Sequence, residues 1–231
     1  FSPDGRRLAY LAMTRPGFEA DRFRIMLREG LDGADREVAP GWDRSPDALV
    51  WSRDGKTLYA TAQDVGQKSL FAIDVATGKV RTIVNEGMVN SPALAAGGRL
   101  LFLLDHLKSP AELVSVRADG SDPVRVTRIN DARLAEVRMG DGEQMSFAGA
   151  EGDTVYAYVV KPADFDPAKK YPVAFLVHGG PQGSFSNQWH YRWSPQVYAG
   201  RGYAVVMVDF HGSTGYGQAF TDAIRGDWGG K

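Results

Sequence analysis

The sequence contains no cysteine, so it forms no disulfide bond, no thiolate zinc site and no cysteine nucleophile. It also lacks an uncharged apolar run of the roughly 18 residues that indicates a membrane-spanning helix. Neither sign of charge is in excess, because 27 lysines and arginines face 28 aspartates and glutamates. Without a basic field to collect phosphates, nucleic acid is not an expected partner. We also expect no membrane partner, no metal and no organic cofactor.

Turn-forming residues are abundant, with 27 glycines and 12 prolines, which favours many short strands. Residues 1–10 (FSPDGRRLAY) match residues 51–60 (WSRDGKTLYA) in form: an aromatic residue, a serine, Asp-Gly, a basic residue and an apolar strand. Residues 94–102 (LAAGGRLLF) are a weaker third copy. Asp-Gly is typical of hairpin turns. A period of roughly 40–50 residues is typical of four-stranded propeller blades.

The first half therefore predicts a partial β-propeller of about three blades over residues 1–130. An antiparallel β-sandwich with coincidental Asp-Gly turns is the alternative.

The pattern changes near residue 131. Residues 145–150 and 154–160 are typical of an antiparallel hairpin, and residues 173–177 (VAFLV) and 204–208 (AVVMV) are continuous apolar runs. Strands without alternation are buried on both faces, as in a parallel sheet covered by helices. We predict helices over residues 192–199 and 216–225, each stopped by glycine. The order of elements predicts the beginning of an α/β domain over residues 131–231.

That segment is too short for a complete α/β domain. The chain starts inside its first repeat, at Phe1, and stops at Lys231 directly after a predicted helix. We therefore expect part of the protein to lie outside these residues. We also expect the strand at 204–208 to present an unpaired apolar edge that another polypeptide segment covers.

The motif His178-Gly179-Gly180-Pro181 directly follows the apolar run at 173–177. Glycines at the carboxyl end of a parallel strand let the backbone approach a ligand and leave amides free to point at it. In α/β-hydrolases a loop of this kind supplies one donor of the oxyanion hole. A tight turn with no ligand is the alternative.

Three motifs in order resemble the prolyl oligopeptidase family of serine peptidases: His-Gly-Gly-Pro at 178–181, Gly-Ser-Thr-Gly-Tyr-Gly at 212–217 and Gly-Asp-Trp-Gly-Gly at 226–230. Within the family, the similarity is strongest to the branch of dipeptidyl-peptidase V and the acylaminoacyl peptidases. The resemblance implies a mixed fold, with part of a β-propeller followed by the N-terminal part of an α/β-hydrolase domain. The implied activity is that of a serine exopeptidase that cleaves short peptides and releases N-terminal dipeptides.

The resemblance also implies a Ser-Asp-His triad, but Gly-x-Ser-x-Gly occurs nowhere in the sequence. We therefore expect no catalytic triad residue in this chain and place the triad after Lys231. An acylaminoacyl peptidase or carboxylesterase with the same hydrolase core is an alternative, and a non-catalytic propeller module is a third.

The resemblance assigns two groups of binding residues. The backbone amide of Gly180, or less favourably that of Gly179, would bind the oxyanion. Glu19, with Asp21 as the alternative, would bind the free α-ammonium of a peptide. A solvated hairpin loop with charge pairs is the other interpretation of the segment that contains these two carboxylates.

The four histidines are assigned structural roles. We expect His178 to orient the Gly-Gly loop, His190 and His211 to hydrogen-bond loops, and His106 to be a surface or packing residue; their spacing does not indicate zinc. The partners implied are short peptides, the C-terminal hydrolase segment that completes the domain, and a second copy in a homodimer. The implied location is the periplasm or the outside of the cell, with the cytoplasm as the alternative.

Overall fold

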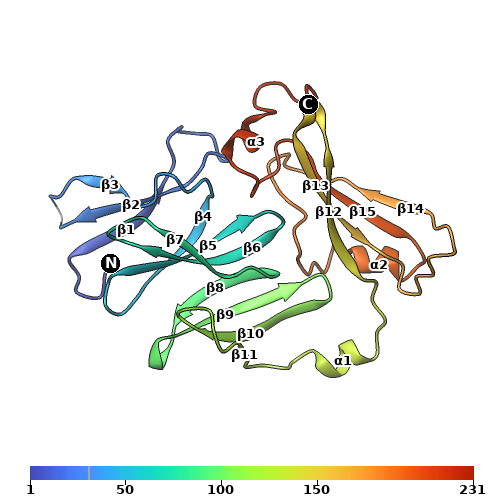
Figure 1. The fold of residues 1–231 in the computed structure, drawn as a ribbon, viewed down its shortest axis with the longest axis horizontal. Coiled ribbons are helices and arrows are strands. Elements are labelled where there is room, and N and C mark those ends of the chain that lie inside the picture. Colours follow the sequence, from blue (N-terminus) through green and yellow to red (C-terminus); the bar gives the residue numbers. More distant parts are fainter. Residues whose placement is uncertain (31) are drawn as a thin grey trace.

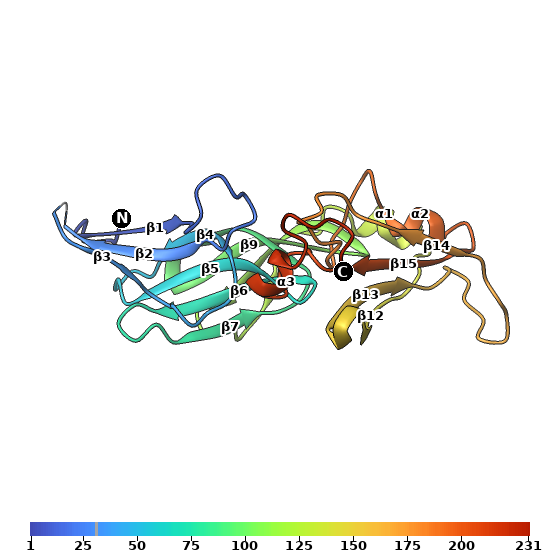
Figure 2. The ribbon, with the colours of Figure 1, turned by 90° about the horizontal axis from the view of Figure 1, so that it is seen from above.

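The structure is a computed structural model that describes residues 1–30 and 32–231. Its strands form three sheets, and short helices lie in the connections between strands. In Figure 1 the strands of the first half lie on one side of the molecule and those of residues 142–209 lie on the other. Figure 2 shows the same two groups at opposite ends of an elongated molecule.

The first two sheets are antiparallel apart from one contact. The first has the order β1-β2-β3, with β1 (Arg7–Ala12), β2 (Arg24–Glu29) and β3 (Asp35–Glu37). The second has the order β11-β10-β9-β8-β6-β5-β4, and β7 pairs with β6 beside this path. Its strands are β4 (Pro46–Trp51), β5 (Thr57–Asp64), β6 (Gln67–Asp74), β7 (Val80–Val84), β8 (Met88–Leu94), β9 (Arg99–His106), β10 (Ser109–Arg117) and β11 (Val124–Arg125).

The second sheet consists of two four-stranded groups, β4 to β7 and β8 to β11. Strands β6 and β8 meet at one parallel pair, Lys68 and Met88, whereas the other neighbours pair antiparallel over several residues. The described residues thus contain three successive antiparallel groups, and these strands form no closed ring.

The two stronger copies of the sequence repeat have the same local structure. In each, the serine hydroxyl donates to the aspartate two residues later, at 2.6 Å from Ser2 to Asp4 and 2.7 Å from Ser52 to Asp54. The next residue is a glycine with left-handed φ, +72° at Gly5, which side chains rarely adopt. The repeat therefore encodes a specific turn as well as a composition.

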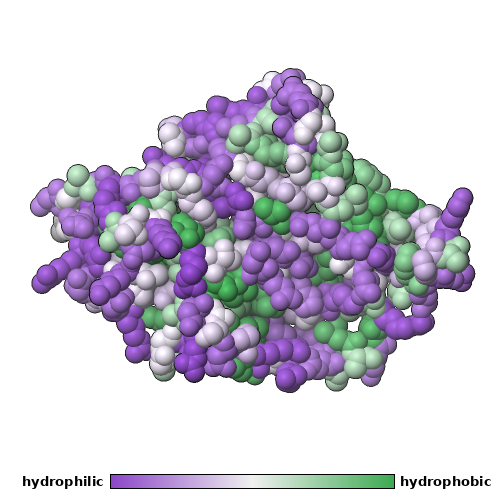
Figure 3. Space-filling view, in the orientation of Figure 1, coloured by the Kyte–Doolittle hydropathy of each residue, from purple (hydrophilic) through white to green (hydrophobic). Residues whose placement is uncertain are grey.

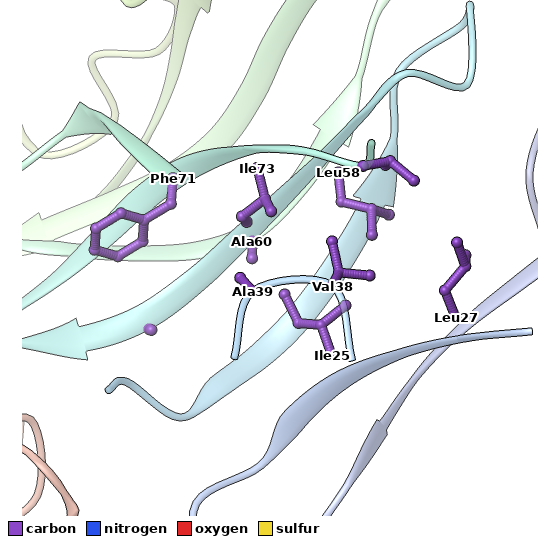
Figure 4. Packing of buried hydrophobic residues seen from close by; sticks show 10 residues of the cluster. Ile25, Leu27, Val38, Ala39, Leu58, Ala60, Phe71 and Ile73 are labelled. Atoms are coloured by element: carbon purple, nitrogen blue, oxygen red, sulfur yellow. The ribbon is translucent and has the colours of Figure 1, made fainter. Parts of the chain in front are cut away.

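Successive side chains of β5 and β6 point to opposite faces of the sheet, and each face carries its own hydrophobic core. Figure 4 shows the first, which joins the first sheet to the second and has as fully buried members Leu27, Leu58, Ala60 and Ile73. The second core lies between the two groups of the second sheet and includes Tyr59, Leu70, Val89, Leu100 and Phe102. Successive residues on β5 thus contact different neighbours, as the two-residue period of a strand requires.

The third sheet contains the parallel strands that the sequence predicted. Its order is β12-β13-β15-β14, and it is formed by β12 (Gly142–Ala148), β13 (Thr154–Val160), β14 (Val173–Leu176) and β15 (Ala204–Asp209). Strands β14 and β15 pair in parallel, while β13 pairs antiparallel with both β12 and β15. The buried side chains Val160, Val205 and Met207 form the centre of a third core.

The prediction that the strand at 204–208 has an unpaired edge is wrong. β15 lies between β13 and β14, so β14 is the edge strand, and its side chains Val173 and Phe175 are 59% and 60% exposed. Chain order does not reveal this, because the β12–β13 hairpin pairs with the later strand β15 and not with β14, which follows it in sequence. Figure 3 shows hydrophobic residues gathered over this part of the molecule.

The helices are shorter than the sequence predicted. They are α1 (Asp131–Ala135), α2 (Pro195–Ala199) and α3 (Gln218–Asp222), with single 3-10 turns at η1 (Ala96–Gly98) and η2 (Ala150–Gly152). α2 begins late because the Ser194 hydroxyl accepts the amide of Gln196, which makes Ser194 the cap. In the part of the chain that the structure describes, no helix has the length and apolar character needed to cross a membrane.

A buried carboxylate on β10 holds the segment that leads to the third sheet. Glu112 is 3% exposed and accepts hydrogen bonds from the Thr127 hydroxyl, the amide of Ile129 at 3.2 Å and the amide of Asn130 at 3.0 Å. Burial by itself would raise the pKa of Glu112, but the hydrogen bonds from Thr127 and the two amides lower it to about 2.

The stability of the protein should therefore depend on the ionised form of Glu112. A depressed pKa adds stability that is complete above the unfolded value of about 4.5 and is lost as the pH falls toward 2. We expect Glu112→Gln to lower the free energy of unfolding at pH 7 by roughly 1–3 kcal/mol and to flatten its loss in acid. Urea unfolding between pH 2 and 7 measures both. Glu143→Gln, on an exposed side chain, is the control, and equal effects of the two changes would contradict the assignment.

Candidate functional site

The Gly-Gly loop, residues 178–183, lies just beyond the carboxyl end of β14. Gly180 has φ +135°, and a Cβ built there would lie 2.6 Å from the backbone nitrogen of Gln182, so the loop accommodates only glycine without a shift. Gly179 and Gly180 line a cavity of about 380 Å³ together with Phe210 and Trp228. Among the described residues, the backbone amides of Gly179 and Gly180 donate hydrogen bonds to no protein acceptor. The loop therefore has backbone donors available beside a cavity.

His178 supports this loop through both ring nitrogens. Nδ1 lies 2.9 Å from the Gly179 carbonyl oxygen, and because a carbonyl only accepts, Nδ1 carries a proton. Nε2 is hydrogen-bonded to the Ser213 hydroxyl at 2.9 Å, and the ring stacks on Phe210 with centroids 4.4 Å apart. With both nitrogens occupied, the ring is suited to orienting the Gly-Gly loop, as the sequence predicted.

A buried carboxylate at the end of β15 joins the loop after the Gly-Gly motif to the loop at 210–217. Asp209 is 2% exposed and accepts hydrogen bonds from the Ser184 hydroxyl at 2.5 Å, the Phe185 amide at 2.8 Å and the Tyr216 hydroxyl at 2.6 Å. Burial and the charge of Asp209 raise the pKa of Tyr216, so the phenol remains a donor. Asp209 was not singled out from the sequence, although its position directly after a buried strand was a usable signal.

The loop at 212–217 continues from this network toward the first half of the chain. The amide of Thr214 donates to the Gly183 carbonyl at 2.8 Å, and the amide of Val65 donates to the Gly215 carbonyl at 3.0 Å. Thr214 and Gly215 also line a second cavity, of about 320 Å³, to which the loop between β1 and β2 contributes Glu19. One loop therefore contacts the Gly-Gly loop on one side and the cavity of Glu19 on the other.

The two carboxylates predicted to bind substrate have different surroundings. Asp21 is 5% exposed and accepts hydrogen bonds from the amides of Thr14 and Arg15 and from Arg15 Nε, at 2.6, 2.8 and 2.7 Å. Burial alone would raise the pKa of Asp21, but these hydrogen bonds lower it. Glu19 is exposed at the cavity. Glu19 is thus the carboxylate that a ligand can reach, while Asp21 is engaged by Arg15 and Thr14.

The other histidines contact their own surroundings. His211 Nε2 lies 3.0 Å from Asp153 Oδ2, and His190 Nδ1 accepts the amides of Arg192 and Trp193. The side chain of His106 is half-buried, and burial lowers its pKa. Within residues 1–30 and 32–231, no three His, Cys, Asp or Glu side chains are grouped as a metal site requires.

The loop that follows the Gly-Gly motif also rests on the first half of the chain. The Asn187 amide donates to the Gly66 carbonyl at 2.7 Å, and the Trp189 amide donates to Asp105 at 2.8 Å. Burial raises the pKa of Asp105 above its usual range. Because each contact joins residues far apart in sequence, pattern analysis had no signal for them.

Comparisons with known proteins agree with the motifs. Residues 189–231 match the model of the prolyl oligopeptidase family. Dipeptidyl-peptidase 5 of Schizosaccharomyces pombe is 37% identical over 99% of the chain, and a probable dipeptidyl-peptidase 5 of Arthroderma benhamiae is 38% identical over 100%. The chain spans about a third of the length of these relatives, 33% and 32%.

Solved structures with the same fold come from related peptidases. The acylaminoacyl peptidase of Pyrococcus horikoshii matches 96% of the chain with a TM-score of 0.80 and 22% identity, and the chain covers 33% of it. Dipeptidyl peptidase 4 of Porphyromonas gingivalis matches 94% with a TM-score of 0.69 and 21% identity, and the chain covers 31% of it. At these identities the likeness to solved structures concerns the fold alone. The resemblance predicted from the three motifs is confirmed: residues 189–231 match the prolyl oligopeptidase family, and nearly the whole chain is similar to proteins named dipeptidyl-peptidase 5.

Proposed function

We propose that this chain is part of a serine peptidase that releases dipeptides from the free N-terminus of short peptides. The observation that carries the proposal is the shared loop at 212–217, which contacts the Gly-Gly loop and lines the cavity of the exposed Glu19. This loop would thereby connect a donor for an oxyanion with the cavity that presents an acceptor for an ammonium ion. The similarity to proteins named dipeptidyl-peptidase 5 over nearly the whole chain supports the same activity.

In this proposal the three strand groups of residues 1–130 are blades of a β-propeller. The sheet of residues 131–231 is the first part of an α/β-hydrolase domain, whose nucleophile, acid and base come from residues outside the chain. The exposed edge and side chains of β14 are the surface on which a further strand of that domain would pair.

The chemistry would be acyl transfer. A serine attacks the scissile carbonyl, a histidine takes the serine proton, and an aspartate orients the imidazole. The present chain supplies electrostatic stabilisation, because the Gly180 amide would donate to the oxyanion that develops on the carbonyl oxygen. The hydrogen bonds of His178 to the Gly179 carbonyl and to the Ser213 hydroxyl would help to orient that amide.

An acylaminoacyl peptidase is the second candidate, favoured by the structural likeness to the Pyrococcus horikoshii enzyme. An N-acylated substrate carries no ammonium ion, so Glu19 would have no cation to bind. Chromogenic dipeptides with a free amine and their N-acetylated counterparts, given to the full-length protein, separate the two activities. A dipeptidyl peptidase prefers the free amine, and a preference for the acetylated form would overturn our proposal.

Replacing Gly180 tests the oxyanion donor. Because a Cβ at residue 180 would crowd the backbone of Gln182, Gly180→Ala should displace the amide and lower kcat by about 10²–10³, with a smaller change in KM. The control is Gly202→Ala, at a glycine that also has a left-handed φ but has open space around its Cβ position. A loss below about tenfold in folded Gly180→Ala, at constant thermal stability, would place the donor elsewhere.

Replacing Glu19 tests ammonium recognition. Hydrogen bonds to charged groups contribute roughly 1.5–3 kcal/mol, so Glu19→Gln should lower kcat/KM on free-amine dipeptides about 10- to 100-fold. N-acetylated substrates, which lack the cation, should be unaffected. Glu29→Gln, on an exposed residue of the same sheet, is the matched control. Equal losses of kcat/KM on both substrate types would indicate damage to the fold. No loss on either type would show that Glu19 belongs to a solvated loop and does not bind the ammonium ion.

A further inference from the structure

The loop between β1 and β2, which carries Glu19, is bound to α3 by one arginine. Arg15 donates from its two terminal nitrogens to Asp222, at 2.8 and 2.9 Å, and from Nε to Asp21 at 2.7 Å. Arg15 and Asp222 are 207 residues apart in sequence and lie on the first sheet's loop and on α3, respectively. A bidentate arginine–carboxylate pair fixes distance and orientation together.

The hydrogen bonds at this contact favour the charged forms of Arg15 and Asp222. The hydrogen bonds that Arg15 donates to Asp222 and Asp21 raise the pKa of Arg15. Burial acts against ionisation of Asp222, but its bonds from Arg15 and Gln218 lower its pKa. Asp21, held by the amides of Thr14 and Arg15, fixes the backbone from which the guanidinium extends.

Two further contacts surround the pair. Gln218 Nε2 donates to the carbonyl of Ala20 at 3.0 Å and to Asp222 at 2.8 Å, so α3 also holds the residue next to Glu19. The ring of Phe18 has the guanidinium of Arg15 at 4.7 Å from its centroid and that of Arg225 at 4.8 Å. The residues on both sides of Glu19 therefore contact the segment at 218–225, Ala20 through its carbonyl and Phe18 through its ring.

We infer that Arg15 and Asp222 are positioning residues that set the distance between the Glu19 carboxylate and the hydrolase sheet, and thereby the length of the N-terminal segment that is accepted. This inference rests on the proposed function. A long side chain on an exposed loop does not by itself define a distance, whereas the same side chain on a loop bound to α3 does. The Arg15–Asp222 pair would thus make the enzyme select two residues before the scissile bond.

The test is Asp222→Asn in the full-length protein, with Asp141→Asn, an exposed carboxylate outside both proposed sites, as the control. On free-amine dipeptidyl substrates we expect a rise in KM of about tenfold with little change in kcat, since an ion pair that orders a loop acts on binding. N-acetylated substrates should be cleaved as before. In the Glu19→Gln background, Asp222→Asn should add almost nothing, because both changes remove the same recognition.

Amide hydrogen exchange of residues 14–22 gives a second, activity-independent readout. Asp222→Asn should accelerate exchange in this loop while β5 and β6 remain unchanged. Faster exchange with unaltered selectivity would overturn the inference and leave the proposed function intact. Full additivity of Glu19→Gln and Asp222→Asn would also overturn it. If the wild-type protein does not prefer free amines, the proposed function itself fails and the selectivity role with it.

Discussion

The geometry of the candidate site depends on one buried carboxylate. Asp209 is the last residue of β15. Its carboxylate accepts hydrogen bonds from a hydroxyl and a backbone amide of the loop after the Gly-Gly motif, and from a phenol of the loop at 210–217. Removing such a carboxylate from water is costly, and here three donors offset that cost. Because the donors come from two loops, Asp209 fixes each loop relative to the sheet and to the other.

The same principle operates between the two halves of the chain. The loop at 212–217 is bound to the Gly-Gly loop through Thr214 and to the β5–β6 turn through Val65, while Arg15 binds the first sheet to α3. The Val65 and Arg15 contacts pair a backbone or charged group on one half with a matching partner on the other. Polar contacts are directional, so they define a spacing between elements that hydrophobic packing alone would leave loose. The proposed ammonium site and oxyanion site would derive their separation from these contacts.

Much of this was predictable from the sequence, for physical reasons. Ser-x-Asp-Gly encodes its turn locally, since the serine, the aspartate and the glycine at Gly5 or Gly55 satisfy one another within a few residues. The apolar runs predicted a parallel pair, and β14 and β15 form one. The Gly-Gly motif predicted free backbone donors, and among the described residues the amides of Gly179 and Gly180 donate to no protein acceptor.

The remainder depends on residues distant in sequence. The edge position of β14 follows from the pairing of β13 with β15, and the partners of Arg15 and Asn187 lie on the other half of the chain. The apolar spacing also predicted helices longer than those observed. For α2 the reason is that Ser194 caps the helix, so it begins at Pro195 and not at residue 192. These features are set by tertiary contacts that no window of sequence contains.

The most direct measurement on Asp209 is amide hydrogen exchange in Asp209→Asn, with Asp141→Asn, an 85% exposed carboxylate, as the control. An amide side chain keeps the size of the carboxylate but loses its charge and one acceptor. If Asp209 organises the site, exchange should rise about tenfold or more in residues 178–186 and in residues 210–217 together, since charged hydrogen bonds of roughly 1.5–3 kcal/mol are lost. Unchanged exchange in both loops, or a rise in only one of them, would contradict the account.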